Sequence, residues 1–130
     1  MADSRNLADN REQTSSRHAL LEHRMLLFAA ETIRTLQSHR ILPRSLVDQL
    51  TRSSASIGAN YTEACNAASK LDFRNKIYIA KKEAAETRYW LDLCIELTNS
   101  AEWIKLKQET QELLLILQTI INSLKPGLAK

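Results

Sequence analysis

The sequence predicts an all-α protein, an antiparallel up-down-up-down four-helix bundle. Only two glycines and two prolines occur in 130 residues, whereas a many-stranded β fold needs turn residues roughly every eight to twelve positions. Apolar residues recur at spacings of three and four in four successive segments, which is the period of an amphipathic helix. With 44% hydrophobic and 25% charged residues, the chain has the composition of one ordinary globular domain.

The first helix is predicted over residues 18–40. One apolar face runs through Leu21, Met25, Phe28, Thr32 and Leu36. Residues 1–17 balance three acids against three arginines and show no apolar period, so they are expected to form a flexible N-terminal tail.

The second helix is predicted over residues 43–68, because Pro43 fits a first helical turn, where its missing N–H has no partner. Its inward face comprises Leu46, Leu50, Ile57, Tyr61 and Ala64. Ser69 precedes Asp72 by three residues, an N-capping arrangement for a third helix that runs to Thr98. Asn99 and Ser100 form the next break.

The fourth helix is predicted over residues 101–124. Its inward face comprises Trp103, Leu106, Thr110, Leu113, Leu117, Ile120 and Leu124. Pro126 and Gly127 are expected to end it. The expected organisation is therefore a four-helix bundle domain over residues 18–125, followed by a short C-terminal tail, 126–130.

Two helices carry more apolar surface than one bundle core can cover. Residues 113–117 are all Leu or Ile, and together they cover the whole circumference of the fourth helix. On the third helix, a second apolar stripe lies about 120° from the core-facing one. We expect an oligomer interface formed by Ile79, Trp90, Leu93, Leu97 and Leu114. The alternative is that a loop or the N-terminal tail covers the stripe.

The second helix also carries a polar face at helical spacing. Its members are Gln49, Arg52, Ser56, Asn60 and Glu63. Such a face is an interhelical network, a ligand contact surface or a solvent-facing stripe. Beside the second apolar stripe, Glu83 and Glu86 fit either an intersubunit ion pair or a solvated edge.

Basic side chains gather on the third helix. Lys70, Arg74, Lys81 and Arg88 share one face at spacings of four, seven and seven. Together with Lys82 and the bordering Tyr78 and Tyr89, they form a candidate nucleic-acid-binding surface. Cations neutralise phosphates without reading sequence, and tyrosines stack on unpaired bases. The alternative is an ordinary solvated face.

Two motifs across the second and third helices resemble a known family. They comprise Leu50, Arg52, Ser56 to Tyr61 and Glu63, followed by Phe73, Ile79-Ala80-Lys81, Glu83, Glu86 and Trp90-Leu91. They resemble the 23S ribosomal RNA intervening sequence proteins over Leu26 to Leu124. The resemblance implies a homopentamer of four-helix bundles. It also implies a relationship to accessory proteins of diversity-generating retroelements, which bind nucleic acid and a reverse transcriptase.

The sequence does not favour an enzyme. It contains no HExxH, no Glu-x-x-His, no P-loop and no dinucleotide fingerprint, so we expect no catalytic residues, metal or cofactor. Arg34 with His39 matches the Arg-x(4 to 6)-His pair of helical ribonucleases, in which Arg stabilises phosphorane-like charge and His moves a proton. Arg17 with His23 matches this short pattern as well.

The remaining features concern location and partners. No apolar run is long enough to span a membrane, and the polar start does not resemble a secretion signal, so we expect a cytoplasmic protein. Cys65 and Cys94 form no CxxC pair and are expected to be free thiols. We therefore predict a non-enzymatic homo-oligomer that binds RNA or DNA, possible partners including a reverse-transcriptase-like protein or a ribonucleoprotein. The alternative is a protein–protein adaptor without nucleic-acid binding.

Overall fold

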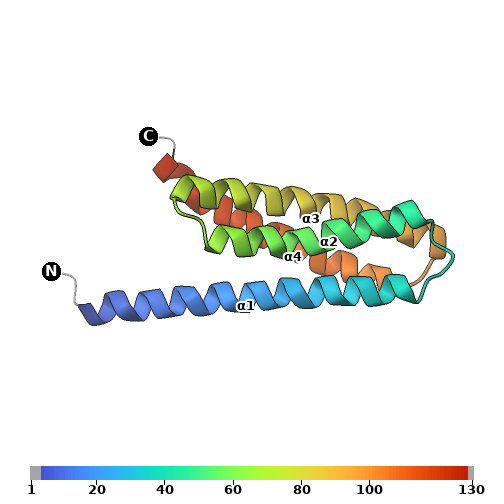
Figure 1. The fold of residues 1–130 in the computed structure, drawn as a ribbon, viewed down its shortest axis with the longest axis horizontal. Coiled ribbons are helices and arrows are strands. Elements are labelled where there is room, and N and C mark those ends of the chain that lie inside the picture. The colour runs from blue at the N-terminus through green and yellow to red at the C-terminus, as the bar shows by residue number, and fades with distance from the viewer. Residues whose placement is uncertain (1–3, 129–130) are drawn as a thin grey trace.

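Four helices account for almost the whole chain in the computed structural model, which describes residues 4–128 and the side chains of residues 5–124. The helices are α1 (Ser4–Gln37), α2 (Arg44–Cys65), α3 (Lys70–Thr98) and α4 (Glu102–Leu128). They run up, down, up and down in one bundle (Figure 1). Helix α3 packs closely on both α2 and α4, whereas α1 and α4 pack least closely of the neighbouring pairs. The predicted fold class is confirmed.

Helix α1 begins much earlier than the sequence pattern predicts. It starts at Ser4 instead of residue 18, and its first part projects beyond the end of the bundle (Figure 1). The side chains of residues 5–17 are all exposed. A helix without a buried face has no apolar period, so periodicity does not reveal it. No Gly or Pro interrupts residues 4–17, and the packed part of α1 supplies the nucleus from which such a segment extends. Residues 1–3 of the expected tail lie outside the described part.

The other helix ends differ from prediction by a few residues. Helix α2 ends at Cys65, three residues early, because a turn at Asn66 and Ala67 precedes the cap of α3. Helix α4 runs to Leu128, past Pro126. Pro126 removes one intrahelical hydrogen bond at this point, and the helix nevertheless continues for two more residues. The C-terminal tail predicted from residue 126 therefore begins within α4, and residues 129–130 lie outside the described part.

The ends of α3 follow the prediction. Ser69 is the N-cap, and its hydroxyl accepts a hydrogen bond of 3.0 Å from the backbone N–H of Asp72. Asn99 ends the helix in the left-handed conformation, with φ of 54°. Asn tolerates this conformation better than most residues do, and its backbone N–H donates to the carbonyl of Ile95 at 2.8 Å.

The core consists of the predicted inward faces with few exceptions. The largest side chains without solvent exposure include Met25, Leu50, Ile57, Tyr61 and Trp103. On α4 the buried residue near the C-terminal end is Ile121, while the predicted Ile120 is only partly buried against the core. The two positions differ by one residue, which rotates the side chain by about 100°.

Small residues of α2 let α1 approach closely. A Cβ added at Gly58 would lie 3.2 Å from the Cβ of Met25. Ser53 and Ser54, also in this small-residue stretch, are fully buried. The Ser53 hydroxyl lies 2.9 Å from the hydroxyl of Thr87 on α3, so buried polar groups of the two helices satisfy one another.

Candidate functional site

The basic side chains predicted to bind nucleic acid all lie on α3. Lys70, Lys82 and Arg88 are exposed, while Arg74 and Lys81 are half-buried. None of the five forms an ion pair with an acid in the part of the chain that the structure describes. By contrast, Lys76 on the same helix pairs with Glu63 at 2.6 Å. No acidic side chain of the described residues therefore neutralises the charges of the predicted face.

The two tyrosines of this face, Tyr78 and Tyr89, are exposed, and the ring of Tyr78 contacts an arginine. The guanidinium of Arg74 lies over the ring of Tyr78, 5.0 Å from its centroid, a cation–π contact. The Nε atom of Arg74 is buried and makes no hydrogen bond to any described residue. Tyr89 is 62% exposed and lies edge-on to Trp90. Its ring therefore has an accessible face next to the charges.

The side chains predicted to form an oligomer interface are partly or fully exposed in the single chain. Ile79 is 38% and Leu97 52% exposed, whereas Trp90, Leu93 and Leu114 are intermediate and pack against the core. The long N-terminal segment does not cover the stripe, because residues 5–17 are exposed along α1. The stripe thus remains open along α3.

Glu83 and Glu86, the glutamates beside this stripe, pair with an arginine of the same chain. The Arg52 guanidinium donates to Glu83 at 3.1 Å and to Glu86 at 2.7 Å, and the indole N–H of Trp90 donates to Glu86 at 3.2 Å. The hydrogen bond from Arg52 is the main cause of a lowered pKa for Glu86. Arg52 and Glu63 of the polar face on α2 both reach α3, so that face is in part an interhelical network.

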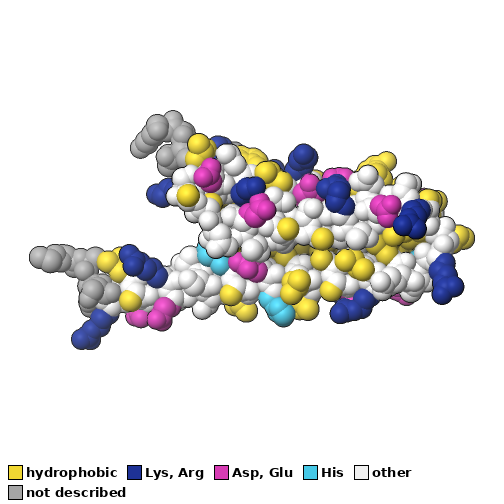
Figure 2. Space-filling view, in the orientation of Figure 1, with side chains coloured by type: hydrophobic (Ala, Val, Ile, Leu, Met, Phe, Trp, Pro, Cys, Tyr) yellow, Lys and Arg dark blue, Asp and Glu magenta, His cyan; other side chains and the backbone are white. Residues whose placement is uncertain are grey.

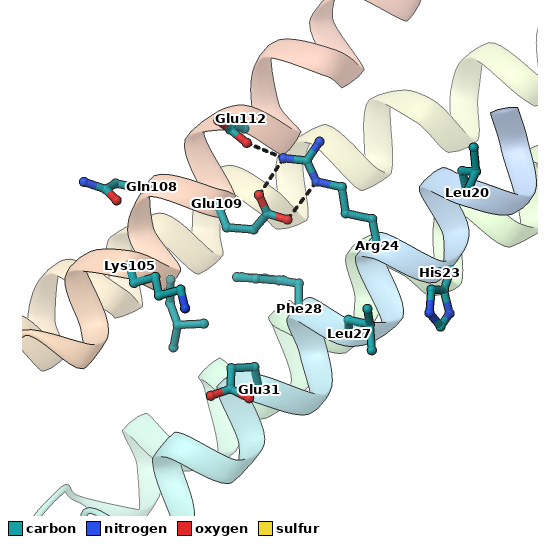
Figure 3. Close-up of a pocket in the computed structure, with 11 residues that line it drawn as sticks. Leu20, His23, Arg24, Leu27, Phe28, Glu31, Lys105, Gln108, Glu109 and Glu112 are labelled. Carbon is teal, nitrogen blue, oxygen red and sulfur yellow. Dashed lines mark hydrogen bonds and ion pairs between the residues drawn. The ribbon is translucent and has the colours of Figure 1, made fainter.

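A groove between α1 and α4 is a second site, which the sequence analysis missed. It encloses about 490 Å³, and Arg24, Phe28, Leu106 and Glu109 are among the residues that line it (Figure 3). Arg24 Nε donates to Glu109 at 2.8 Å, and Arg24 also pairs with Glu112. The sequence signal was the spacing of Leu20 and Leu27, which places two leucines on one side of the predicted helix.

The residues of the ribonuclease hypothesis engage different partners. Arg34 pairs with Glu31 at 3.3 Å on α1, whereas His39 lies beyond the end of α1, 3.4 Å from Glu102 and beside the ring of Trp103. In the second match, Arg17 with His23, the histidine is exposed and lines the α1–α4 groove. Neither histidine is paired with a nucleophile or held over a phosphate-sized pocket with its arginine, so the structure adds nothing to this hypothesis.

A buried polar cluster lies where α1 leaves the bundle. His18 Nδ1 lies 2.5 Å from the hydroxyl of Tyr61, and its ring contacts Phe73. Burial raises the pKa of Tyr61 and of the nearby thiol of Cys65. Burial also raises the pKa of Cys94 to about 11. Both cysteines are free thiols, as predicted, and both are held in the unreactive protonated form at neutral pH.

The described residues show neither a cluster of metal-ligating side chains nor a membrane-spanning helix. Among the described residues, no group of three or more His, Cys, Asp or Glu side chains is arranged to hold a metal ion. No helix in residues 4–128 is long and apolar enough to cross a membrane.

Comparisons with known proteins agree with the fold. The profile of the family described as 23S rRNA-intervening sequence protein matches residues 17–119. A solved structure from Bacteroides thetaiotaomicron, described as a protein with unknown function from the S23 ribosomal protein family, is 33% identical. The alignment covers 77% of this chain and 96% of that chain, with a TM-score of 0.68. A search of curated proteins finds no match. The chain therefore belongs to the 23S rRNA-intervening sequence protein family.

Proposed function

We propose that this protein is a non-enzymatic homo-oligomer that binds RNA or DNA through the basic face of α3. The face consists of Lys70, Arg74, Lys81, Lys82 and Arg88 with the exposed rings of Tyr78 and Tyr89. The ligand is the sugar–phosphate backbone with unpaired bases beside it, in an intervening-sequence or retroelement-like setting in the cytoplasm.

The observation that carries this proposal is the absence of ion pairs on that face. Six other basic side chains, including Arg24, Arg52 and Lys107, pair with acids in the described part of the chain. The five cations of the α3 face do not. A cation without an acidic partner gains more from a phosphate than a paired one, because no existing contact has to be broken. On the face of the molecule in view in Figure 2, charges of both signs lie interspersed.

Self-association would strengthen such a face. One copy supplies few phosphate contacts, whereas a symmetric assembly repeats them and binds through several copies at once. The open stripe at Ile79 and Leu97 supports association, and the family resemblance implies that the assembly is a pentamer.

The test is a binding titration over a salt series. Fluorescently labelled structured RNA and duplex DNA are titrated with the protein and with the double variant Lys81→Glu, Arg88→Glu. For duplex DNA, each lost phosphate contact reduces the slope of log K against log salt by about 0.9. We expect the double variant to bind at least about tenfold more weakly and with a flatter salt dependence, because like charges now face the phosphates.

The control variant changes the same net charge elsewhere. Arg40→Glu with Lys105→Glu alters two exposed cations outside α3. It should retain most of the affinity, and light scattering on each sample checks that assembly is unchanged. Absence of binding at low salt, or an equal loss in the control variant, would exclude the α3 face as the binding surface.

A further inference from the structure

We propose that Gln111 and Gln118 of α4 contact the bases of a single nucleic-acid strand whose phosphates lie on the cations of α3. The combined surface then binds an unpaired strand more tightly than a duplex of the same sequence. This inference rests on the proposed function and adds to it two residues of a second helix and a choice between ligands. It is carried by the register of α3 against α4, the position of the nearby acids and the uncharged edge of α4.

An ion pair fixes the register of α3 against α4. The Nζ atom of Lys107 on α4 lies 2.7 Å from Oδ1 of Asp92 on α3, and the two helices pack closely while running in opposite directions (Figure 1). Both helices rise by about 1.5 Å per residue, so positions equally far before Asp92 and after Lys107 are level with each other. Steps of four and eleven residues reach Arg88 and Lys81 on α3, and Gln111 and Gln118 on α4.

The same steps keep these four side chains at the boundary between the two helices. Steps of four and eleven residues rotate a side chain by only about 40° and about 20° from its starting direction. Arg88 and Lys81 therefore lie on the edge of α3 that also carries Asp92. Gln111 and Gln118 lie on the facing edge of α4. An amide thus stands beside a cation at two levels, about 10 Å apart along the helices.

The acids along this part of α3 lie apart from the cations. The acids of residues 70–96 are Asp72, Glu83, Glu86, Asp92 and Glu96. Glu83 and Glu86 pair with Arg52 of α2. Asp92 is already held by its lysine on α4. Asp72 lies about 160° around the helix from the first cation of the face, and Glu96 lies about two turns beyond the last. Among the described residues, no carboxylate of α3 therefore competes with a phosphate for the cations at the α4 edge.

The facing edge of α4 carries amides and no charge. Residues 113–124 contain no Asp, Glu, Lys or Arg, and Glu112 forms its ion pair on the α1 side of the helix. Gln111 is exposed, and its side chain makes no hydrogen bond to any residue that the structure describes. Gln118 is half-buried, and its Nε2 donates to Oδ1 of Asn122 at 2.8 Å, which leaves its own carbonyl oxygen to accept from a ligand.

Amides at this edge suit unpaired bases. An amide carries both a donor and an acceptor, as the edge of an unpaired base does. In a duplex those edges are engaged in base pairing, so a helix lying on the backbone meets phosphates and sugars. Tyr78 and Tyr89 lie about 60 to 80° around α3 from Lys81, where they can stack further bases of the same strand. The α4 amides therefore add affinity for a single strand and little for a duplex.

The experiment compares one RNA sequence in two forms. A fluorescein-labelled strand of about twelve nucleotides without self-complementarity, and the duplex that it forms with its complement, are titrated by anisotropy over a salt series. We expect Gln111→Leu with Gln118→Leu to weaken binding of the single strand at least about fivefold, because leucine has a similar size but forms no hydrogen bond. Affinity for the duplex should change less than about twofold, and the salt slope should stay the same, because no phosphate contact is lost.

The control variant places the same two leucines elsewhere. Gln13→Leu with Gln49→Leu replaces exposed amides of α1 and α2. It should bind both forms of the RNA as the wild type does. Light scattering and urea unfolding on each sample check that assembly and stability are unchanged.

The outcomes separate this inference from the proposed function. If Lys81→Glu with Arg88→Glu weakens binding while the glutamine variant binds the single strand as tightly as the wild type, the α3 face stands and the α4 contact is refuted. An equal loss on strand and duplex, or a wild type that prefers the duplex, would also overturn the inference, since the amides would then not contact unpaired bases. A wild type that binds neither form at low salt removes the proposed function, and this inference with it.

Discussion

At the scale of single residues, two arginines use the same arrangement to tie the bundle together. Arg24 of α1 faces Glu109 and Glu112, and Arg52 of α2 faces the pair Glu83 and Glu86. In both cases the glutamates are three residues apart, so one turn of the facing helix presents both carboxylates to one guanidinium. The planar guanidinium suits this geometry because its donors point in fixed directions.

This arrangement makes stability depend on pH. The hydrogen bond from Arg24 lowers the pKa of Glu109 below 4.5, so the folded state binds the proton less readily than the unfolded state. The stabilisation is complete above pH 4.5 and is lost as the pH falls through the lowered pKa. Glu109→Gln should therefore flatten the fall of the urea unfolding midpoint as the pH is lowered below 4.5. Glu12→Gln, on the exposed part of α1, serves as control; an equal flattening there would refute the assignment.

Residues of this kind show what the sequence can and cannot predict. The inward faces were predictable because burial imposes a period. The glutamates beside the α3 stripe were expected in an intersubunit ion pair or at a solvated edge, and they pair instead with Arg52 of the same chain. Their partner Arg52 and the pairing of Arg24 with Glu109 were not predictable, since 31 and 85 positions separate the partners. Side-chain reach across helices depends on helix rotation, which periodicity gives only to within tens of degrees.

At the scale of elements, caps mark helix ends more reliably than composition does. Ser69 and Asn99 were correctly placed because each has a specific local reason, a side-chain acceptor for free N–H groups and tolerance of positive φ. The ends expected from polar composition or proline, at residue 18 and residue 126, were wrong. Polar composition does not stop a helix that packing has already nucleated, and Pro126 lies in the last turn of α4, where it costs a hydrogen bond without ending the helix.

The cap at Ser69 makes a measurable contribution to the free energy of unfolding. Ser69→Ala removes the acceptor for the Asp72 N–H and should lower the free energy of unfolding by about 1 kcal/mol. Ser69→Asp retains an acceptor and should unfold close to the wild type in the same urea titration. An alanine variant as stable as the wild type would show that water or another group replaces the hydroxyl.

At the scale of the whole molecule, the bundle has an open apolar surface on two sides. One is the α3 stripe, which the sequence predicts because its apolar residues are too many for one core. The other is the α1–α4 groove, which depends on how far apart two helices lie. No local pattern encodes that separation, so the groove was not predictable from the sequence.

The α3 stripe gives a prediction about assembly. In light scattering we expect the wild-type protein at a multiple of 14.8 kDa and Leu97→Asp at a lower multiple, because a charge in an apolar interface costs several kcal/mol when unpaired. Leu97 is 52% exposed in the single chain, so the variant should fold. Ile41→Asp is the control, because Ile41 is 82% exposed and lies between α1 and α2, away from the stripe. A monomeric wild type, or an unchanged mass for the Leu97 variant, would show that the α3 stripe is not an oligomer interface.

Because the start of α1 projects from the bundle, the backbone hydrogen bonds in the two parts of this continuous helix should have different lifetimes. Backbone amides after His18 are protected by the packing of the bundle and exchange with solvent deuterium only when the bundle opens. Amides of residues 5–17 lack that packing and open by fraying from the end. The exchange boundary should therefore fall near the contact of His18 with Tyr61, in the middle of an uninterrupted helix.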